Sequence, residues 1–531
     1  MQIFRGVAGL SAALFLSTAL TAAHAATPAD TLVVAKNIDD IISLDPAEVF
    51  EITGGEVINN LYTRLVTHET SDFTKLVGGV AESWTVSPDG GSITFKLRKG
   101  LTFHSGNPVT AEDVAWSLQR VVALDKTPAF ILTQFGWTPA NVAENVRAVD
   151  AETLTITLPK KYASSLVLNA LSAGVGSVID SKLVKPHEKD GDWGHGWLKT
   201  ASAGSGAFSL IAWSPKEAVA LQANPAYYLG QPALKQVVLR HVPEASTQRL
   251  LLEKGDADIA RNLQPDQVEA LGATGHFTIS SEPKQTVLYL GLNQKKAELA
   301  RPEVREAVRW LVDYDGLAAT VLKGQYQTHQ AFLGEGILGA LNDTPFHLDV
   351  ARAKELLKKA GLEKGFDVTL DVANASPYLE IGQSIQATFK QAGINVELLQ
   401  ADQLQVVTKY RARKQELVLI YWSPDYLDPH STADYFATNP DNSDAGPVKT
   451  LPWRNAWDIP ELNRLTEAAA QETDTDKRAA AYKELQGIVQ KDTPLTVLFQ
   501  QVEVSVLGHN VSGFVSGPTF DTVNYAAVKK Q

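Results

Sequence analysis

A regular alternation of helix and strand patterns between residues 349 and 421 limits the possible folds more than any other part of this sequence. Amphipathic stretches typical of helices alternate with short apolar runs typical of strands, and Gly361 and Gly393 follow the first two helices as stop signals. The predicted helices span 349–360, 379–392 and 403–411, and the predicted strands span 368–372, 394–399 and 417–421. Such an alternation predicts βαβ units and a parallel sheet that helices cover on both faces.

The stretch from Ala81 to Gln119 carries the densest set of local signals in the chain. Ser87-Pro88-Asp89-Gly90-Gly91 is typical of a turn, because Pro presets φ, Asp caps the turn and Gly accepts a positive φ. Apolar and polar residues then alternate from 93 to 97, as in a half-buried strand. Thr110, with Asp113 three residues later, is close to a capping box. We therefore expect a hairpin and a capped helix, and no residue of the stretch indicates catalysis.

Length, charge and composition exclude several classes of protein. A chain of 531 residues is too long for one hydrophobic core, and its 44% apolar content without low-complexity runs indicates a globular protein of two to four domains. The formal net charge of -12 argues against nucleic acid and anionic membranes as binding partners, since both require a basic surface. The complete absence of cysteine excludes disulfides, thiolate metal sites and cysteine nucleophiles.

The N-terminus has the three parts of a secretory signal peptide. Arg5 is followed by an apolar stretch from Val7 to Leu20 and by Ala23-His24-Ala25, which predicts a signal peptide of residues 1–25 with cleavage after Ala25. The apolar run is shorter than the roughly 20 residues that a transmembrane helix needs, so a membrane anchor is disfavoured.

The residues from Trp84 to Val114 form a long pattern, W-x-x-S-x-D-G-x-x-x-x-F-x-L-R-x-G-x-x-F-H-x-G-x-P-V-T-A-x-D-V. This pattern resembles the signature of family 5 bacterial extracellular solute-binding proteins, periplasmic receptors for dipeptides, oligopeptides, nickel chelates and opines. The resemblance implies an α/β fold of the two-lobed periplasmic binding protein type, class II and large cluster C. It also implies a discontinuous first lobe with an extra subdomain.

The resemblance also sets expectations for extents and partners. We expect the first lobe to comprise 26–285 and 500–531, with a subdomain of about 69–195 inserted, and the second lobe to comprise 286–499. Hinges are expected near 282–292 and in the strands 495–499 and 502–506. The implied partners are a small ligand and the permease subunits of an ABC importer, with a monomeric receptor and no nucleic acid. Because no cysteine is available for lipid attachment, a Gram-negative periplasm is the expected compartment.

The predicted site lies where the strand 417–421 ends, since ligands of open α/β sheets bind outside the carboxyl ends of strands. There Trp422 to His430 reads WSPDYLDPH. It is similar to the W-x-x-D-x-x-[DE]-P loop of peptide receptors in the family, which makes Trp422 a pocket wall, Asp425 the anchor of the ligand's amine and Asp428-Pro429 the structural end of the loop. An ammonium group has only donors, so a shielded carboxylate complements it. The full set of predicted ligand-binding residues is Tyr62, Tyr421, Trp422, Pro424, Asp425 and Tyr426.

Two departures from the family pattern widen the choice of ligand. The arginine that usually binds a ligand carboxylate is absent from both places where it is expected, since Leu419 stands near the loop and 373–378 contains no basic residue. A peptide or peptide-like amine is therefore expected, with a nickel chelate, an opine or another non-peptide solute as the alternative.

Tyr62 is interpreted more readily as a core residue of a helix than as a ligand contact.

Metal binding and catalysis are the weaker interpretations. His430 lies close in sequence to Asp428 and Asp434, yet one imidazole with carboxylates is a weak metal motif, so we predict no metal site and no cofactor. The sequence contains no G-x-S-x-G, H-E-x-x-H or P-loop motif, and Gly334 to Gly339 matches G-x-G-x-x-G without the flanking strand and helix that the motif requires. We expect a binding protein, and a periplasmic hydrolase is the alternative of another class.

Overall fold

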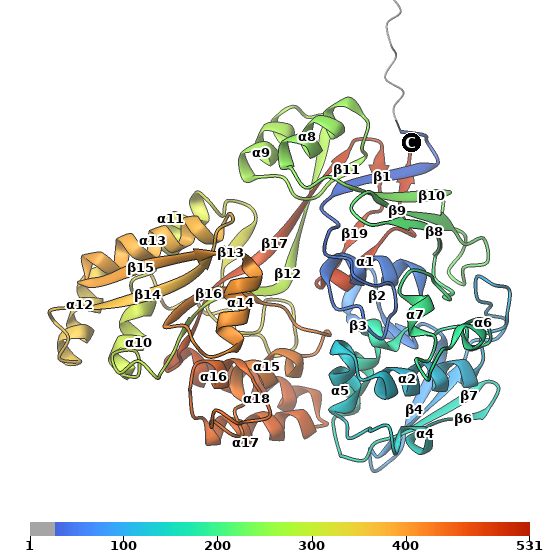
Figure 1. Cartoon of the computed structure of the whole chain (residues 1–531), viewed down its shortest axis with the longest axis horizontal. Helices are drawn as coiled ribbons and strands as arrows, with labels where there is room; N and C mark the ends of the chain where they lie inside the picture. The colour runs from blue at the N-terminus through green and yellow to red at the C-terminus, as the bar shows by residue number, and fades with distance from the viewer. Residues whose placement is uncertain (1–26) are drawn as a thin grey trace, which may run out of the picture.

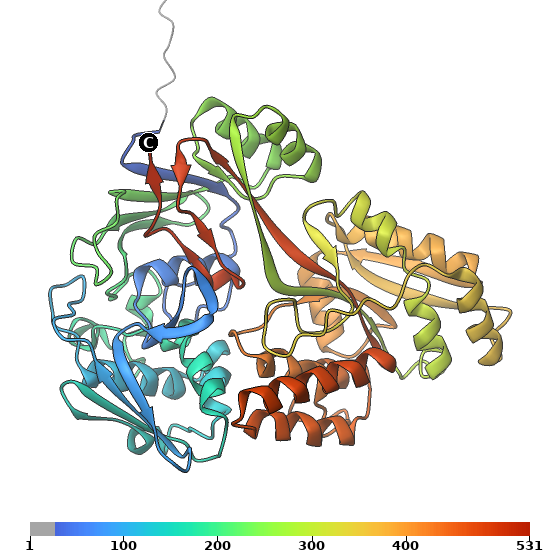
Figure 2. The same cartoon turned by 180° about the vertical axis from the view of Figure 1, so that it is seen from behind.

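Two lobes lie side by side in the computed structural model, which describes residues 27–531 (Figure 1). Two long strands, β12 (Phe277–Leu292) and β17 (Leu495–Gly508), run from one lobe to the other, as the reverse view also shows (Figure 2). The predicted signal peptide, residues 1–25, lies outside the described residues. From residue 27 to 531, no helix has both the length and the apolar character needed to span a bilayer.

One sheet of 11 strands extends through both lobes in the order β15-β14-β16-β12-β17-β11-β1-β10-β9-β8, with β13 paired to β17. Its strands in the first lobe are β1 (Thr31–Lys36), β8 (Phe208–Ser214), β9 (Ala218–Ala223), β10 (Gln236–His241) and β11 (Ile259–Ala260). Those of the second lobe are β13 (Tyr326–Thr328), β14 (Phe366–Ala373), β15 (Ile394–Ala401) and β16 (Leu417–Trp422). The predicted extents of the two lobes remain a proposal.

The sheet of the second lobe is mixed, which corrects the expectation of a parallel sheet. β14 pairs in parallel with β15 and β16, as the βαβ pattern predicts. However, β16 pairs antiparallel with β12, and β12 pairs antiparallel with β17. The reason is the connectivity, because β12 carries the chain into the second lobe and β17 carries it back, so the two strands run in opposite directions.

β17 is a single strand, whereas the sequence suggested two strands, 495–499 and 502–506. The polar residues between them continue the strand because Gln500 is fully buried and its amide is satisfied there. Its Nε2 donates to the Lys284 carbonyl, and its Oε1 accepts from the backbone N–H of Glu335.

The helices of the second lobe begin and end close to their predicted positions. Gly361 and Gly393 both have positive φ, 70° and 91°, as expected for glycines that end helices. The helices are α10 (Pro302–Arg309), α11 (Tyr314–Ala319), α12 (Val350–Lys359), α13 (Tyr378–Gln391), α14 (Gln403–Arg411), α15 (Pro429–Ala437), α16 (Leu451–Arg454), α17 (Pro460–Gln471) and α18 (Thr475–Lys491).

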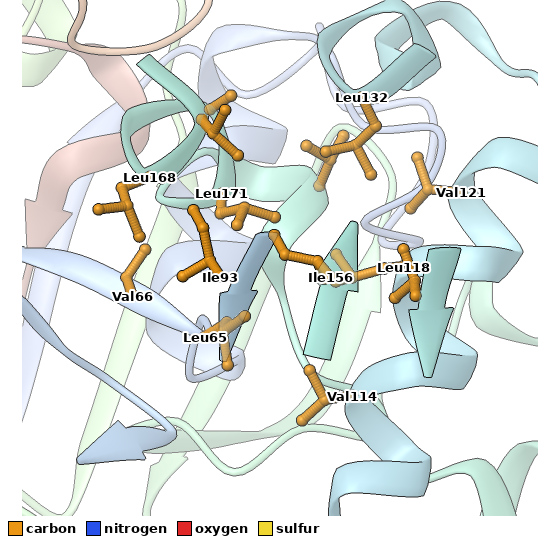
Figure 3. Packing of buried hydrophobic residues seen from close by; sticks show 14 of the residues in the cluster. Leu65, Val66, Ile93, Val114, Leu118, Val121, Leu132, Ile156, Leu168 and Leu171 are labelled. Atoms are coloured by element: carbon orange, nitrogen blue, oxygen red, sulfur yellow. The ribbon is translucent and has the colours of Figure 1, made fainter. Parts of the chain in front are cut away.

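The hairpin and capped helix predicted between 81 and 119 are present. β4 (Ala81–Val86) pairs antiparallel with β5 (Ser92–Leu97), and the Asp113 carboxylate accepts hydrogen bonds from the backbone N–H and hydroxyl of Thr110 at the start of α2 (Ala111–Leu124). With β6 (Val146–Asp150) and β7 (Thr153–Thr157) they form a four-stranded sheet, β4-β5-β7-β6. Figure 3 shows the core between this sheet and its helices, with Ile93, Leu118 and Ile156 among its side chains.

The first lobe contains further elements, of which α1 is buried in the core. They are α1 (Ile52–Leu61), β2 (Val66–Glu69), β3 (Asp72–Gly78), α3 (Phe130–Thr133), α4 (Val142–Asn145), α5 (Ser164–Leu171), α6 (Ser181–Val184), α7 (His195–Leu198), α8 (Ala245–Lys254) and α9 (Pro265–Ala273). Four strands of two residues follow β17 and return the chain to the first lobe.

Buried charges connect the two crossover strands to the first lobe. Glu503 on β17 pairs with Arg261, and also with Lys284 on β12 at 2.8 Å. Arg261 continues to Glu56 at 2.7 Å, and Glu56 pairs with Lys36 at 2.6 Å. Burial alone would raise the pKa of Glu503, but Arg261 and Lys284 hold it well below its usual range. Glu503 therefore stays ionised although it is shielded from water, and we call these five residues the hinge network.

Removing one member of the hinge network leaves its counter-charges uncompensated in the interior. We expect Glu503→Gln to lower the free energy of unfolding by about 3 to 5 kcal/mol, the usual cost of breaking a buried ion pair. Urea denaturation of the mature chain measures this change. Glu461→Gln, which breaks the exposed pair with Arg464, is the matched control and should leave the midpoint unchanged. Equal midpoints for both variants would contradict a stabilising role of the network.

Candidate ligand-binding site

A cavity of about 420 Å³ lies where the two lobes meet. The first lobe contributes one side through α3 and Gln134, which follows it directly. The second lobe contributes the other side through the loop after β16, α15, and α16 with the residues before it. The residues that line it are Phe130, Thr133, Gln134, Asp425, Tyr426, Ser431, Asp434, Tyr435, Val448, Lys449, Thr450 and Arg454. The predicted loop after β16 therefore borders an interlobe cavity, as the strand-end rule predicts.

Three hydrogen bonds hold the loop that follows β16. The hydroxyls of Ser423 and of Thr286 on β12 lie 2.7 Å apart, and the backbone N–H of Asp425 donates to Oγ of Ser431 at 2.8 Å. At the end of the loop, the Asp428 carboxylate accepts from the backbone N–H of His430 and so caps α15, with Pro429 at its first position. The loop is therefore fixed at both ends, with the Asp425 side chain on the cavity.

Asp425 is a shielded carboxylate that has no counter-charge among residues 27–531. Its Oδ2 has no contact with solvent and accepts no hydrogen bond from the described residues. Burial, together with the negative charges of Asp521 and Asp434, raises the pKa of Asp425 to about 8. An ionised carboxylate in this position requires a cation, which a ligand's ammonium group would supply.

Trp422 and Tyr426 are placed beside the cavity in different ways. The Trp422 ring does not line the cavity itself but lies against the ring of Tyr435, which does, with ring centroids 4.2 Å apart. Tyr426 lines the cavity but is only 4% exposed, and its hydroxyl lies 3.2 Å from Oε1 of Gln134 in the first lobe. Trp422 therefore supports the wall, and Tyr426 contributes to contact between the lobes.

Tyr421, Pro424 and Tyr62 do not line this cavity. Tyr421 is 38% exposed, and Pro424 is buried within the loop. Tyr62 lies in the core of the first lobe, 2% exposed, with its hydroxyl accepting from the backbone N–H of Ala203 at 3.3 Å. Its burial agrees with the core interpretation, and ligand contact by these three residues remains a prediction.

Most of the other lining residues were missed in the sequence analysis. Asp434 and Tyr435 lie on α15, while Lys449 and Arg454 come from α16 and the segment before it. No local pattern marks these residues as ligand contacts, and they follow the predicted loop, which ends at His430, by 4 to 24 positions. Phe130 from the first lobe completes an aromatic row with Tyr435, at a ring distance of 6.4 Å.

Hydrogen bonds cross between the lobes next to the cavity. Asp428 forms a two-fold ion pair with Arg478, at 2.6 and 2.9 Å, and also accepts from Nδ2 of Asn169 in the first lobe at 3.0 Å. Arg478 extends to Oγ of Ser165 at 3.4 Å, again in the first lobe. Burial alone would raise the pKa of Asp428, but Arg478 holds it below its usual range. Asp428 therefore both caps α15 and helps to hold the lobes together, in agreement with its predicted structural role.

His430 is buried, and burial lowers the pKa of its imidazole despite the nearby carboxylates of Asp434 and Asp428. Its backbone N–H belongs to the first turn of α15. Within the part of the chain that the structure describes, no group of three or more histidine or carboxylate side chains is arranged to hold a metal ion. The geometry thus adds nothing to the metal interpretation of His430.

A two-lobed α/β fold with long crossover strands and an interlobe cavity defines the class of periplasmic binding proteins. Within this class, residues 75–444 match the model of the bacterial extracellular solute-binding proteins, family 5 Middle. The chain belongs to this family, which confirms the resemblance carried by Trp84 to Val114.

Curated relatives and solved structures agree with this assignment. The chain is 30% identical over 517 residues to the probable D,D-dipeptide-binding periplasmic protein DdpA of Escherichia coli K12, covering 96% of each chain. The periplasmic binding protein DppA from Helicobacter pylori, solved with the peptide STSA, has a TM-score of 0.77 at 24% identity, covering 94% of this chain and 98% of the other. AgaA from A. tumefaciens R10, solved with agropinic acid, has a TM-score of 0.76 at 21% identity, covering 94% and 99%. The two structural likenesses establish the fold alone.

The raised pKa of Asp425 makes the stability of the ligand-free protein depend on pH. Its carboxyl has a pKa near 3.8 when unfolded and about 8 in the folded protein, so the folded state binds the proton more tightly. The stabilising contribution is therefore fully present below about pH 4 and is lost as the pH rises through 8. We expect Asp425→Asn, which cannot ionise, to raise Tm by about 2 °C or more at pH 8, with a smaller difference at pH 5.

Calorimetric scans of ligand-free protein at both pH values test this expectation. Asp441→Asn is the matched control, because Asp441 is exposed and its pKa is lowered by hydrogen bonds from Ser443. The control should not reproduce the gain at pH 8. A Tm difference between Asp425→Asn and the unchanged protein that is independent of pH would contradict a bare, shielded carboxylate.

Asn169→Ala removes the interlobe hydrogen bond to Asp428 without removing a charge. We expect ligand affinity to fall by about fivefold or more, mainly through faster dissociation, because the arrangement with the lobes in contact loses a bond to a charged acceptor. Stopped-flow measurement of Trp fluorescence gives both rates. Asn395→Ala is the control, since Asn395 binds the Asp367 carboxylate at 2.9 Å on the surface of one lobe. Equal dissociation rates for the two variants would show that the Asn169 bond does not hold the lobes together.

Proposed function

We propose that this protein is a periplasmic receptor that captures a short peptide, or a peptide-like amine-bearing ligand, between its lobes and delivers it to an ABC importer. The observation that carries the proposal is Asp425, a shielded carboxylate on the interlobe cavity with no cation from the described chain near enough to pair with it. A ligand ammonium at this position would form a charge-assisted hydrogen bond in a site that excludes water. Its binding would thus supply the counter-charge that the ionised form of Asp425 lacks among the described residues.

The size of the cavity and the names of the relatives support a small peptide as the ligand. A volume of about 420 Å³ lies within the range of small-molecule sites, about 300 to 1,000 Å³. Its walls combine aromatic rings, Phe130 and Tyr435, with a few charged groups. DdpA is named as a D,D-dipeptide-binding protein, and the H. pylori protein was solved with a tetrapeptide. An opine, a nickel chelate or another non-peptide solute is the alternative, and agropinic acid in AgaA shows that the fold accommodates one.

Binding without turnover is the better account of the same residues. The family consists of solute-binding proteins, and two of the hydroxyls that line the cavity, those of Ser431 and Thr450, have other hydrogen-bonding roles. Oγ of Ser431 accepts from the backbone N–H of Asp425, and the Thr450 hydroxyl donates to the Thr438 carbonyl. Neither hydroxyl is hydrogen-bonded to a histidine in the described chain, so neither is activated in the manner of a hydrolase nucleophile.

The compartment and the importer are part of the same proposal. Residues 1–25 have the pattern of a cleaved signal peptide, and the relative in E. coli is named as a periplasmic protein. The H. pylori protein is described as associated with an ABC transporter. A receptor of this kind would release its ligand to membrane permease subunits after export to the periplasm.

The amine anchor is tested by calorimetry with the ligand that copurifies with the protein, identified by mass spectrometry. We expect Asp425→Ala to weaken binding of an amine-bearing ligand by at least tenfold, since a hydrogen bond to a charged group contributes about 1.5 to 3 kcal/mol. Asp441→Ala, on the exposed segment before Lys449, is the control and should bind normally. A loss below threefold in Asp425→Ala would exclude Asp425 as the anchor, and hydrolysis of peptides by the purified protein would overturn the binding function.

A further inference from the structure

The second lobe supplies two cations to the cavity, Lys449 and Arg454. Neither forms an ion pair with a carboxylate of the described residues; the nearby pair of Arg413 with Asp444 shows that this region does form such pairs. Nε of Arg454 donates to the Lys449 carbonyl at 3.0 Å, which orients the side chain. A guanidinium has five N–H donors, and this bond uses only one of them. Arg454 therefore lines the cavity with donors that form no hydrogen bond to the described residues.

The packing of Arg454 limits where its charge can lie. Its guanidinium lies over the ring of Tyr410, 5.4 Å from the centroid, and the side chain is only half-buried. Tyr410 is fully buried and is held by hydrogen bonds to Tyr289 and Asn455. A planar cation stacked on a fixed ring is oriented in advance, so less conformational entropy is lost when it binds a planar anion.

Two carboxylates and two cations line the same cavity. Asp425 and Asp434 line it together with Lys449 and Arg454, yet no ion pair among the described residues joins the two groups. Tyr435 is influenced by both groups, because Asp425 and Asp434 add to the effect of burial in raising its pKa to about 12 while Arg454 opposes them. The fold therefore holds opposite charges apart across one small cavity.

A separation of this kind suits a ligand that carries both charges. The family pattern provides no arginine at the two expected positions, near Leu419 and in 373–378, so a carboxylate of the ligand would be left without a counter-charge there. Arg454 can supply one from a different segment of the chain. A guanidinium also matches the geometry of a carboxylate through two parallel hydrogen bonds.

We propose that Arg454, assisted by Lys449, binds a carboxylate of the ligand, and that the cavity therefore selects zwitterions whose amine is held at the Asp425 end. This inference rests on the proposed function of the same cavity and assigns a specificity residue to it. It defines the substrate class as short peptides with a free C-terminus, and as amino acid derivatives with the same pair of charges. Peptide amides and simple amines fall outside this class.

The test compares a dipeptide with its C-terminal amide. Calorimetry on the mature chain first identifies which of L-Ala-L-Ala, D-Ala-D-Ala and tri-L-alanine binds most tightly. The affinities of that peptide and of its C-terminal amide are then compared. We expect the amide to bind the unchanged protein at least tenfold more weakly than the free acid. In Arg454→Gln the acid should weaken by a similar factor while the amide does not, so that the two affinities come within threefold of each other.

Three variants make the result specific. Arg411→Gln removes the same charge from an exposed residue that does not line the cavity, and it should keep the preference for the acid. Arg454→Lys keeps the charge but loses the two parallel bonds, so an intermediate preference is expected. Asp425→Asn should weaken acid and amide by the same factor, because it acts on the amine end.

Each outcome decides a different point. If the unchanged protein binds acid and amide equally well, Arg454 does not bind the ligand's carboxylate. This result holds even where Arg454→Gln does not fold. The amine anchor is then still supported if Asp425→Asn weakens the binding of both ligands. An unchanged preference in Arg454→Gln overturns the role of Arg454 likewise. If no peptide of the panel binds, the substrate class inferred here fails, whereas the proposed function is decided separately by calorimetry with the ligand that copurifies.

Discussion

The antiparallel pairing of β12 with β17 is the constraint on which the rest of the structure depends. It runs from the pair Phe277 and Gly508 to the pair Gly291 and Leu495, and so carries one backbone ladder between the lobes. A buried ion pair between Lys284 and Glu503 joins the two strands, and a second one between Glu503 and Arg261 joins them to the first lobe. The ladder is irregular between Pro283 and Val287, which lies within the range predicted for the first hinge. The hinge remains a prediction, but any relative motion of the lobes has to bend this one pair of strands.

Asp425 differs from several other buried carboxylates in the charges that surround it. Three other buried carboxylates, Glu56, Asp428 and Asp45, each have an arginine or lysine within 3 Å. In those cases the positive charge offsets the cost of burial. Asp425 is shielded to a similar degree on one oxygen and has only other carboxylates near it. Since Glu56, Asp428 and Asp45 have cations within the protein and Asp425 has none among the described residues, we infer that the cation for Asp425 comes from a ligand.

How much could be predicted from sequence depended on the range of the interaction. The capping of α2 by Thr110 and Asp113 and the loop that places Asp425 were predictable, because each is decided within a few residues. The direction of β12 and β17 was not, since an apolar run reads the same in a parallel or an antiparallel pair. Arg454 and Phe130 were not predicted as site residues either, because they reach the cavity only through tertiary packing. Tyr426 shows an intermediate case, as its position on the loop was clear while its contact with Gln134 was not.

The same charges explain why ligand binding and lobe closure would be coupled. In the arrangement of the lobes described here, Asp425 is shielded and is influenced by the negative charge of Asp521 of the first lobe, which disfavours the ionised carboxylate. Asn169 and Ser165 favour the arrangement by bonding to Asp428 and Arg478. Without a ligand these contributions oppose each other, whereas an ammonium at Asp425 removes the unfavourable one and leaves the favourable bonds in place. A ligand can shift a conformational equilibrium only through such differential binding, and here the difference arises at a single carboxylate.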